Sequence, residues 1–312
     1  MPGGCCVIPT FIIFFREGIE ASMIIAILLS YLNRIGQRRY FRDIFLGVAV
    51  ALVLVVAGGV ASFLLIDQYN GSNVQTYFET VTYLLAAGAL TYMTFWMQRH
   101  ARTMAKELQR RSDLALSGGT RFGLGVLAFQ AVGREGVETM VFMLAIIFAS
   151  TKQAATPIHG KFLILGAVLG LVIALAMAFW IYRLGARLNL RRFFQTLGVL
   201  LMVFAAGLLA DAIENLQQLA WLPFGRGVIW NSSSLLSEGS NIGDVLHSLL
   251  GYAERPTVLQ AVIWIAYVVI AAGAFIRIGR PREGAGGQAD SIDPSEKKQK
   301  SSTILARGNW LH

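Results

Sequence analysis

Long apolar runs alternate with short polar segments along most of this chain. A helix needs about 20 mainly apolar residues to cross a bilayer, and seven of the runs are long enough. The predicted spans are 8–31, 44–66, 77–97, 122–149, 161–182, 194–213 and 258–276. The pattern therefore predicts an all-α, polytopic membrane protein with seven transmembrane helices.

The composition supports this fold class, because 55% of the 312 residues are apolar and only 14% are charged. The net charge of +9 would favour a nucleic-acid partner in a soluble protein. Here the basic residues gather in short segments between spans, where they act as topology determinants. We therefore expect membrane association and no nucleic-acid binding.

The basic clusters follow every second predicted span, beginning with the first. They lie at 34–42, 99–111, 183–192 and 277–282. Because basic loops stay in the cytoplasm, the N-terminus is predicted outside and the C-terminus inside. Spans one to three then start outside and spans four to six start inside, which is the pattern of an inverted repeat.

This layout divides the chain into a transmembrane domain, 1–280, and a tail, 281–312, whose Gly/Ser/Lys-rich composition predicts disorder in the cytoplasm. Within the domain we predict repeat one at 8–97, repeat two at 122–213, an outer segment at 214–257 and a seventh span at 258–276. Helical spacing of apolar residues in 241–251 predicts a short interfacial helix in the outer segment.

A charged pentapeptide, Arg-Glu-Gly-x-Glu, occurs at 16–20 in the first span and again at 134–138 in the fourth. Charges at this depth cost several kcal/mol each unless they are paired, hydrated or bound to an ion. On a helix, the three charged side chains of each motif cluster over one turn. Together the two motifs carry a net charge of −2, and carboxylates are ligands for hard cations.

The simpler interpretation is that each Arg–Glu pair only holds two helices together. The duplication, and a second glutamate that one arginine cannot neutralise, favour an ion site instead. We therefore expect the two motif faces to turn inward and pack together, with Glu20 and Glu138 near one shared ion. Gly18 and Gly136 leave room for a neighbouring helix or an ion to approach the backbone.

Acidic residues near the predicted outer ends of spans three and six admit two interpretations. Glu79, Asp211 and Glu214 could line an entry path that concentrates cations, or they could be ordinary solvated carboxylates. We interpret His247, in the predicted interfacial helix, as a surface residue.

The paired motifs, the seven-span layout and the Tyr83 to Met97 region resemble the oxidase-dependent iron transporter family, the fungal high-affinity iron permeases and bacterial EfeU-type permeases. The resemblance covers about 1–280. It implies a multi-pass protein of the plasma or inner membrane that imports iron after an outer partner oxidises or delivers it. It also implies metal ligands at Glu17, Glu20, Glu135 and Glu138, with Arg16 and Arg134 balancing charge.

Other functions remain open at this point. The same carboxylates could serve a carrier for another hard divalent cation, or a proton-coupled transporter. A membrane enzyme is not expected, because the sequence has no nucleophile elbow, phosphate loop or pair of histidines. No organic cofactor is implied. The sequence leaves open the oxidation state of the iron, the driving force, the partner and the oligomeric state.

Overall fold

All regular structure in the described part of the chain is helical. The computed structural model describes residues 7–67, 72–100, 107, 110, 112–114, 123–151, 159–184, 190–234, 236–237 and 240–279. Its helices are α1 (Val7–Arg34), the 3₁₀ helix η1 (Arg38–Tyr40), α2 (Phe41–Asp67), α3 (Asn73–His100), α5 (Gly123–Thr151), α6 (His159–Leu184), α7 (Leu190–Gln218), α8 (Asn241–Leu250) and α9 (Val258–Gly279). The predicted tail lies outside the described residues.

Four candidate membrane spans stand out by length and apolar composition alone. They are Arg38–Leu65, Lys161–Trp180, Gln195–Gln218 and Val258–Ile278. The other long helices, α1, α3 and α5, have 28, 28 and 29 residues, which at 1.5 Å per residue is also enough to cross a bilayer. Helices α1 and α5 each carry three charges at their centre. The count of seven spans and their orientation therefore stay predictions.

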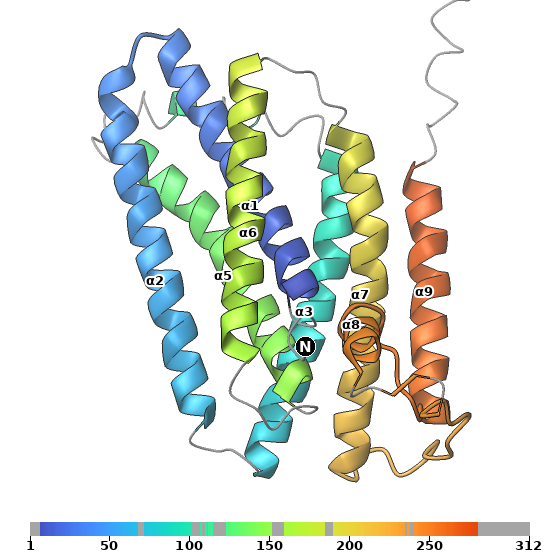
Figure 1. Ribbon diagram of the computed structural model, residues 1–312. Coiled ribbons are helices and arrows are strands. Elements are labelled where there is room, and N and C mark those ends of the chain that lie inside the picture. Colours follow the sequence, from blue (N-terminus) through green and yellow to red (C-terminus); the bar gives the residue numbers. More distant parts are fainter. Residues whose placement is uncertain are drawn as a thin grey trace, which may run out of the picture.

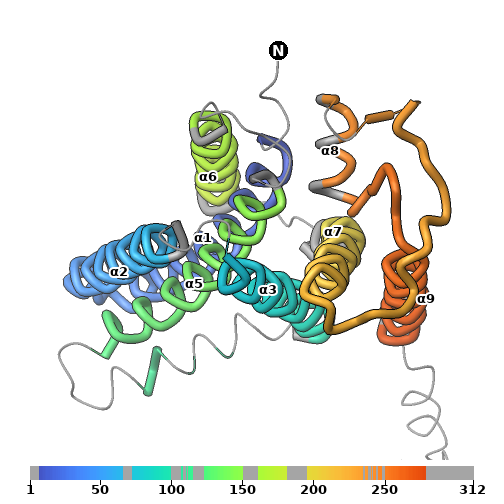
Figure 2. Tube along the Cα trace, turned by 90° about the horizontal axis from the view of Figure 1, so that it is seen from below, coloured from blue at the N-terminus to red at the C-terminus, as the bar shows by residue number. Residues whose placement is uncertain are grey.

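The long helices of one half of the chain pack mainly against those of the other half. Helix α1 packs most extensively against α6, α2 against α5, and α3 against α7. The two motif helices, α1 and α5, also contact each other, as the sequence predicted. Figures 1 and 2 show α1 and α5 crossing in the interior, flanked by α2, α3 and α6, with α9 at the far side of α7.

The glycine of each motif marks the closest approach of a neighbouring helix. A Cβ atom on Gly18 would lie 2.9 Å from Cβ of Ala174 on α6. A Cβ atom on Gly136 would lie 2.6 Å from Cγ2 of Val55 on α2. Only a hydrogen at these positions allows the helices to approach so closely. The expected role of the two glycines in close packing is therefore confirmed, with α6 and α2 as the partners.

The predicted interfacial helix forms as α8, between α7 and α9 in the chain. Its first turn is capped by the hydroxyl of Ser240, which accepts a hydrogen bond from the Gly243 amide. It ends at Gly251, whose φ of 66° is left-handed. A Cβ on Gly251 would lie 2.2 Å from Cα of Gly207, so α8 ends against the backbone of α7. Helix α8 also contacts α1 and α5.

Candidate functional site

The first motif forms a compact ion-pair cluster in the interior of the bundle. Arg16, Glu17 and Glu20 are each only 3% exposed. Arg16 Nη1 donates a hydrogen bond to Glu17 Oε1 at 2.5 Å, and Arg16 Nη2 lies 3.4 Å from Glu20 Oε1. One guanidinium therefore serves two carboxylates, an arrangement that its planar, forked geometry allows.

The second motif is more open, although its sequence is nearly the same. The Arg134 side chain is 44% exposed, and its Nε donates to Glu138 Oε1 at 3.2 Å. The rest of this guanidinium turns toward α3, where Nη2 lies 2.9 Å from Met93 Sδ and Cζ lies 5.2 Å from the centre of the Trp96 ring. A cation over an indole face is favourable. Arg134 thus neutralises its own motif less completely than Arg16 does.

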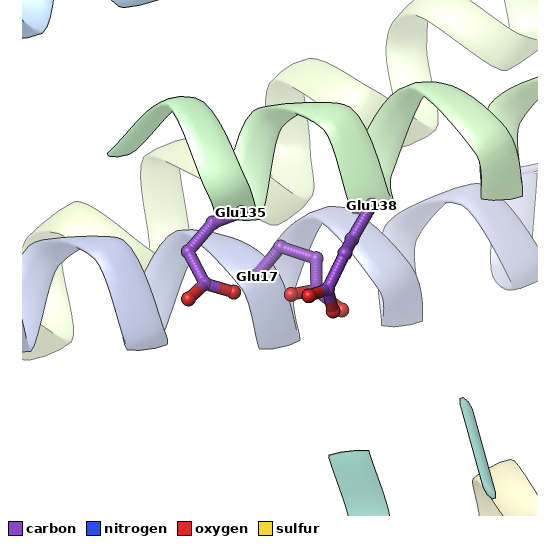
Figure 3. A group of neighbouring side chains, drawn as sticks. All are labelled: Glu17, Glu135 and Glu138. Carbon is purple, nitrogen blue, oxygen red and sulfur yellow. The ribbon is translucent and has the colours of Figure 1, made fainter. Parts of the chain in front are cut away.

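Three glutamates from the two motifs meet between α1 and α5. One carboxylate oxygen from each of Glu17, Glu135 and Glu138 lies within 4.8 Å of the other two. Figure 3 shows the three side chains reaching toward the same side from the two crossing helices, with the Glu17 and Glu138 carboxylates side by side. Residues far apart in the sequence thus contribute to one acidic cluster.

Each of these glutamates also has a buried oxygen, Oε2, with no hydrogen-bond partner among the described residues. A buried carboxylate oxygen without a donor is costly, and a bound cation would satisfy it. Carboxylate oxygens are suited to hard cations such as Mg²⁺, Ca²⁺ and Mn²⁺ and can also bind iron. The cluster therefore has the chemistry of a cation site within the described part of the chain.

The sequence predicted that Glu20 and Glu138 share one ion, and this stays a prediction. Glu20 lies in the same buried turn and pairs with Arg16, but the three-glutamate group contains Glu17 in its stead. The charges of Glu138 and Arg134 still act on Glu20, so it remains part of the same electrostatic unit. The unit thus contains all four glutamates and both arginines of the two motifs.

A groove between α2 and α5 leads to the second motif. Its volume is about 630 Å³, and its wall includes Gln130, Arg134 and Glu138 among mainly apolar residues. The Glu138 side chain is 18% exposed, unlike those of the first motif. The acidic cluster is thus closed on the α1 side and more accessible on the α5 side.

The predicted entry residues lie in polar contacts near the ends of α3 and α7. Glu79 is buried and accepts hydrogen bonds from Gln75 at 2.9 Å and Asn215 at 3.5 Å. Glu214 accepts from Gln218 at 3.0 Å and from Gln260 of α9 at 3.4 Å.

Asp211, one turn before Asn215 on α7, is also buried. It lines a cavity of about 320 Å³ between α7, α8 and α9, together with Glu214, Tyr252 and Trp264. An entry role for these residues stays a prediction.

His247 was interpreted as a surface residue, and this was wrong. The side chain is only 8% exposed, and its Nε2 lies 3.9 Å from Asp211 Oδ1. It shares the buried side of α8 with Gly243, one turn earlier. The i, i+4 spacing of Gly243 and His247 is visible in the sequence. It indicates that His247 is buried only when the structure shows that Gly243 packs against other backbone atoms.

A helical bundle with a buried, charged cluster at its centre and apolar outer helices defines a multi-pass membrane transporter. The comparisons with known proteins give the particular family. The chain belongs to the iron permease FTR1 family, whose model matches residues 7–279.

Among curated relatives, the ferrous iron permease EfeU of Escherichia coli O157:H7 is 33% identical over 280 residues, covering 88% of this chain and 96% of the relative. The ferrous iron permease EfeU of Yersinia pestis is 33% identical over 290 residues, covering 91% and 99%. No solved structure matches the chain. The resemblance drawn from the two motifs is thus confirmed, and the protein is a multi-pass protein of the cell membrane.

Proposed function

We propose that this protein imports iron across the membrane through the acidic cluster of Glu17, Glu135 and Glu138. The observation that carries the proposal is the meeting of three buried carboxylates from two helices, each with an oxygen that lacks a hydrogen-bond partner among the described residues. Membership in a family of iron permeases supports iron as the transported ion.

In this mechanism the cation replaces its lost hydration with carboxylate oxygens inside the bundle. Arg16 holds Glu17 and Glu20 in place and keeps the empty site from carrying an excess of negative charge. Glu20 acts as a reserve ligand one turn from Glu17. Glu138 is the more accessible carboxylate and exchanges the ion with the groove beside it.

We also propose that the two halves of the domain form an inverted repeat. The pairing of α1 with α6 and of α5 with α2 supports this, because exchanging the halves converts one pair into the other. The glycine in each motif faces the corresponding partner helix, which fits the same relation. A site between inverted halves is where many transporters bind their substrate.

An extracytoplasmic protein that oxidises or delivers iron completes the proposal. The resemblance of the paired motifs to the oxidase-dependent family supports such a partner. The bacterial relatives are called ferrous iron permeases, after the reduced ion.

A second candidate is a carrier for another hard divalent cation, or a proton-coupled transporter that uses the same carboxylates. The observation that favours it is the chemistry of the cluster, since oxygen ligands alone discriminate weakly among such ions.

Uptake by proteoliposomes tests both candidates. Ferrous, ferric, manganous and zinc ions are compared side by side, with and without an imposed pH gradient. We expect iron uptake by the wild type and near-complete loss in Glu17→Gln and Glu138→Gln, which keep side-chain size but remove a charge. A protein that transports manganese or zinc but no iron would refute the proposal, and so would normal iron uptake by the folded double variant.

A further inference from the structure

Outside the motif cluster, the described residues bring a histidine and an aspartate together in a buried position near one end of α7. His247 lies on α8 and Asp211 on α7, and Nε2 of the former is 3.9 Å from Oδ1 of the latter. Figure 1 shows α8 beside the lower half of α7. Both side chains are more than nine-tenths buried.

The tautomer of His247 follows from its second contact. Nδ1 lies 2.7 Å from the carbonyl oxygen of Tyr252, which can only accept a hydrogen bond. Nδ1 therefore carries the proton, and in the neutral ring Nε2 presents its lone pair toward Asp211. Histidines that bind metals are commonly oriented in this way, with the distal nitrogen bonded to a backbone carbonyl.

The spacing between the two ligand atoms suits a bridging ion better than a direct bond. At 3.9 Å, Nε2 and Oδ1 are too far apart for a hydrogen bond. Two ligand atoms that each lie about 2.1 Å from one ion are about 3.0 Å apart when the ligand–ion–ligand angle is a right angle. They are about 4.2 Å apart when the two ligands lie on opposite sides of the ion. The observed distance falls between these limits.

From this geometry we propose that His247 and Asp211 form an outer metal site that captures a first-row divalent cation, Fe²⁺ in the context of the proposed function. Imidazole favours such borderline ions, whereas ferric iron prefers oxygen ligands. This outer site rests on the proposed import of iron for its biological ion. Its existence as a metal site does not depend on that proposal.

The position of the outer site connects it to the acidic cluster. At 1.5 Å per residue, Asp211 lies about 10 Å from the C-terminal end of α7, measured along the helix axis. Glu138 lies about 20 Å from the C-terminal end of α5 and is therefore deeper in the bundle. Helix α8 touches α1 and α5 as well as α7. Under the predicted topology, an ion bound at His247 would be between the outer surface and the cluster.

Another carboxylate, that of Glu79, lies near the predicted outer end of α3 and contacts the turn of α7 that follows Asp211. Asn215, one turn further along α7, donates a hydrogen bond to Glu79 on α3 at 3.5 Å. The hydroxyl of Tyr83 lies within electrostatic reach of both Asp211 and Glu79. Two protein ligands alone do not fill a coordination shell, so we expect an ion at this site to keep several water ligands.

The backbone holds the outer site in place. Gly251, directly before Tyr252, is in the left-handed conformation and packs against Gly207 of α7. Tyr252 is fixed further by its hydroxyl, which donates to the Leu236 carbonyl at 2.9 Å. The carbonyl that orients His247 is thus part of a rigid turn.

The decisive variant is His247→Asn. The Asn amide nitrogen takes the place of Nδ1 and can still donate to the Tyr252 carbonyl, while the ligand atom Nε2 is lost. Asp211→Asn replaces the other ligand with a weaker amide oxygen. Glu254→Gln is the control, because this outer carboxylate pairs with Arg255 instead. All variants are made in the full chain and compared in thermal unfolding.

The probe is Co²⁺, which resembles Fe²⁺ in ligand preference but does not oxidise in air during the measurement. Binding is measured by calorimetry on the purified protein in two backgrounds. One is the wild type, and the other carries Glu17→Gln and Glu138→Gln, which weaken the motif cluster. We expect His247→Asn and Asp211→Asn to weaken one Co²⁺ site at least about tenfold in both backgrounds, the scale known for disturbed metal sites. Glu254→Gln should retain it.

Transport provides the second measurement. For Fe²⁺ uptake, His247→Asn should raise KM about tenfold while the maximal rate stays within about twofold of wild type, because only capture is affected. Unchanged Co²⁺ binding in His247→Asn would overturn the outer site, and so would a raised KM without weaker binding. If the wild type transports no iron, the proposed function fails, but the binding measurement still decides whether this site exists.

Discussion

Gly136 of α5 faces Val55 of α2 so closely that a Cβ on the glycine would lie 2.6 Å from Val55 Cγ2. Gly18 of α1 has the corresponding relation to Ala174 of α6. The glycine that follows the first glutamate of each motif is therefore a contact point for a neighbouring helix. This contact sets how the glutamates on either side are held.

Gly136→Ala should destabilise the protein by about 1–3 kcal/mol, the usual cost of overpacking a filled interior. Val55→Ala should restore much of this loss, because it removes the methyl group that the new Cβ meets. Thermal unfolding in detergent measures both effects. Gly88→Ala on α3 is the control, since nothing lies within 4 Å of a Cβ there. If Gly136→Ala destabilises the protein equally with and without Val55→Ala, the close contact between Gly136 and Val55 is contradicted.

The two motif arginines should differ in their sensitivity to lysine. Arg16 is buried and contacts two carboxylates, so Arg16→Lys leaves one of them without a partner and should reduce iron uptake at least about tenfold. Arg134 is half-exposed and forms a salt bridge with one carboxylate, that of Glu138, among the described residues, so Arg134→Lys should remain within about threefold of wild type. Equal losses in initial uptake rate would show that the difference in burial has no functional consequence.

Glu17 and Glu20 should also be separable. Glu17→Gln removes a member of the three-glutamate group and should abolish uptake, whereas Glu20→Gln should retain a measurable rate with a raised KM. An amide oxygen is a weaker ligand for a hard cation than a carboxylate. Uptake is measured at equal amounts of inserted protein. If Glu20→Gln is inactive and Glu17→Gln is active, the first motif contributes Glu20 and not Glu17 as its ligand.

Single-cysteine variants test the predicted topology in a background without the two native cysteines. Labelling with a membrane-impermeant maleimide on intact cells should reach Asn73→Cys and Ser234→Cys from outside. Arg39→Cys, between α1 and α2, should react only after the membrane is opened. Labelling of Arg39→Cys in intact cells would contradict the predicted orientation, with the N-terminus outside, and the inverted repeat depends on that orientation.

Much about this protein followed from local sequence alone. The apolar runs predicted the long helices because a bilayer leaves an isolated chain segment no other way to satisfy its backbone. The amphipathic spacing in 241–251 predicted α8 for a similarly local reason, and the helix is found at Asn241–Leu250. The duplicated motif pointed to the family because three charges in one turn of a span are rare and costly.

Only the tertiary structure decided which of these residues meet. The i, i+3 and i, i+4 spacings bring Arg16, Glu17 and Glu20 to one turn, but they do not fix how α1 is rotated against α5. That rotation brings Glu17 into one group with Glu135 and Glu138 and leaves Glu20 within reach of the Glu138 charge. It depends on where α6 and α2 pack against the motif glycines.

The contact of His247 with Asp211 also could not be predicted from the sequence. A single histidine in a short amphipathic helix reveals nothing about Asp211, which lies 36 positions earlier in the printed sequence. The pair forms because Gly251 lets the chain turn against Gly207 on α7, and a backbone contact of this kind leaves no periodic pattern in the sequence.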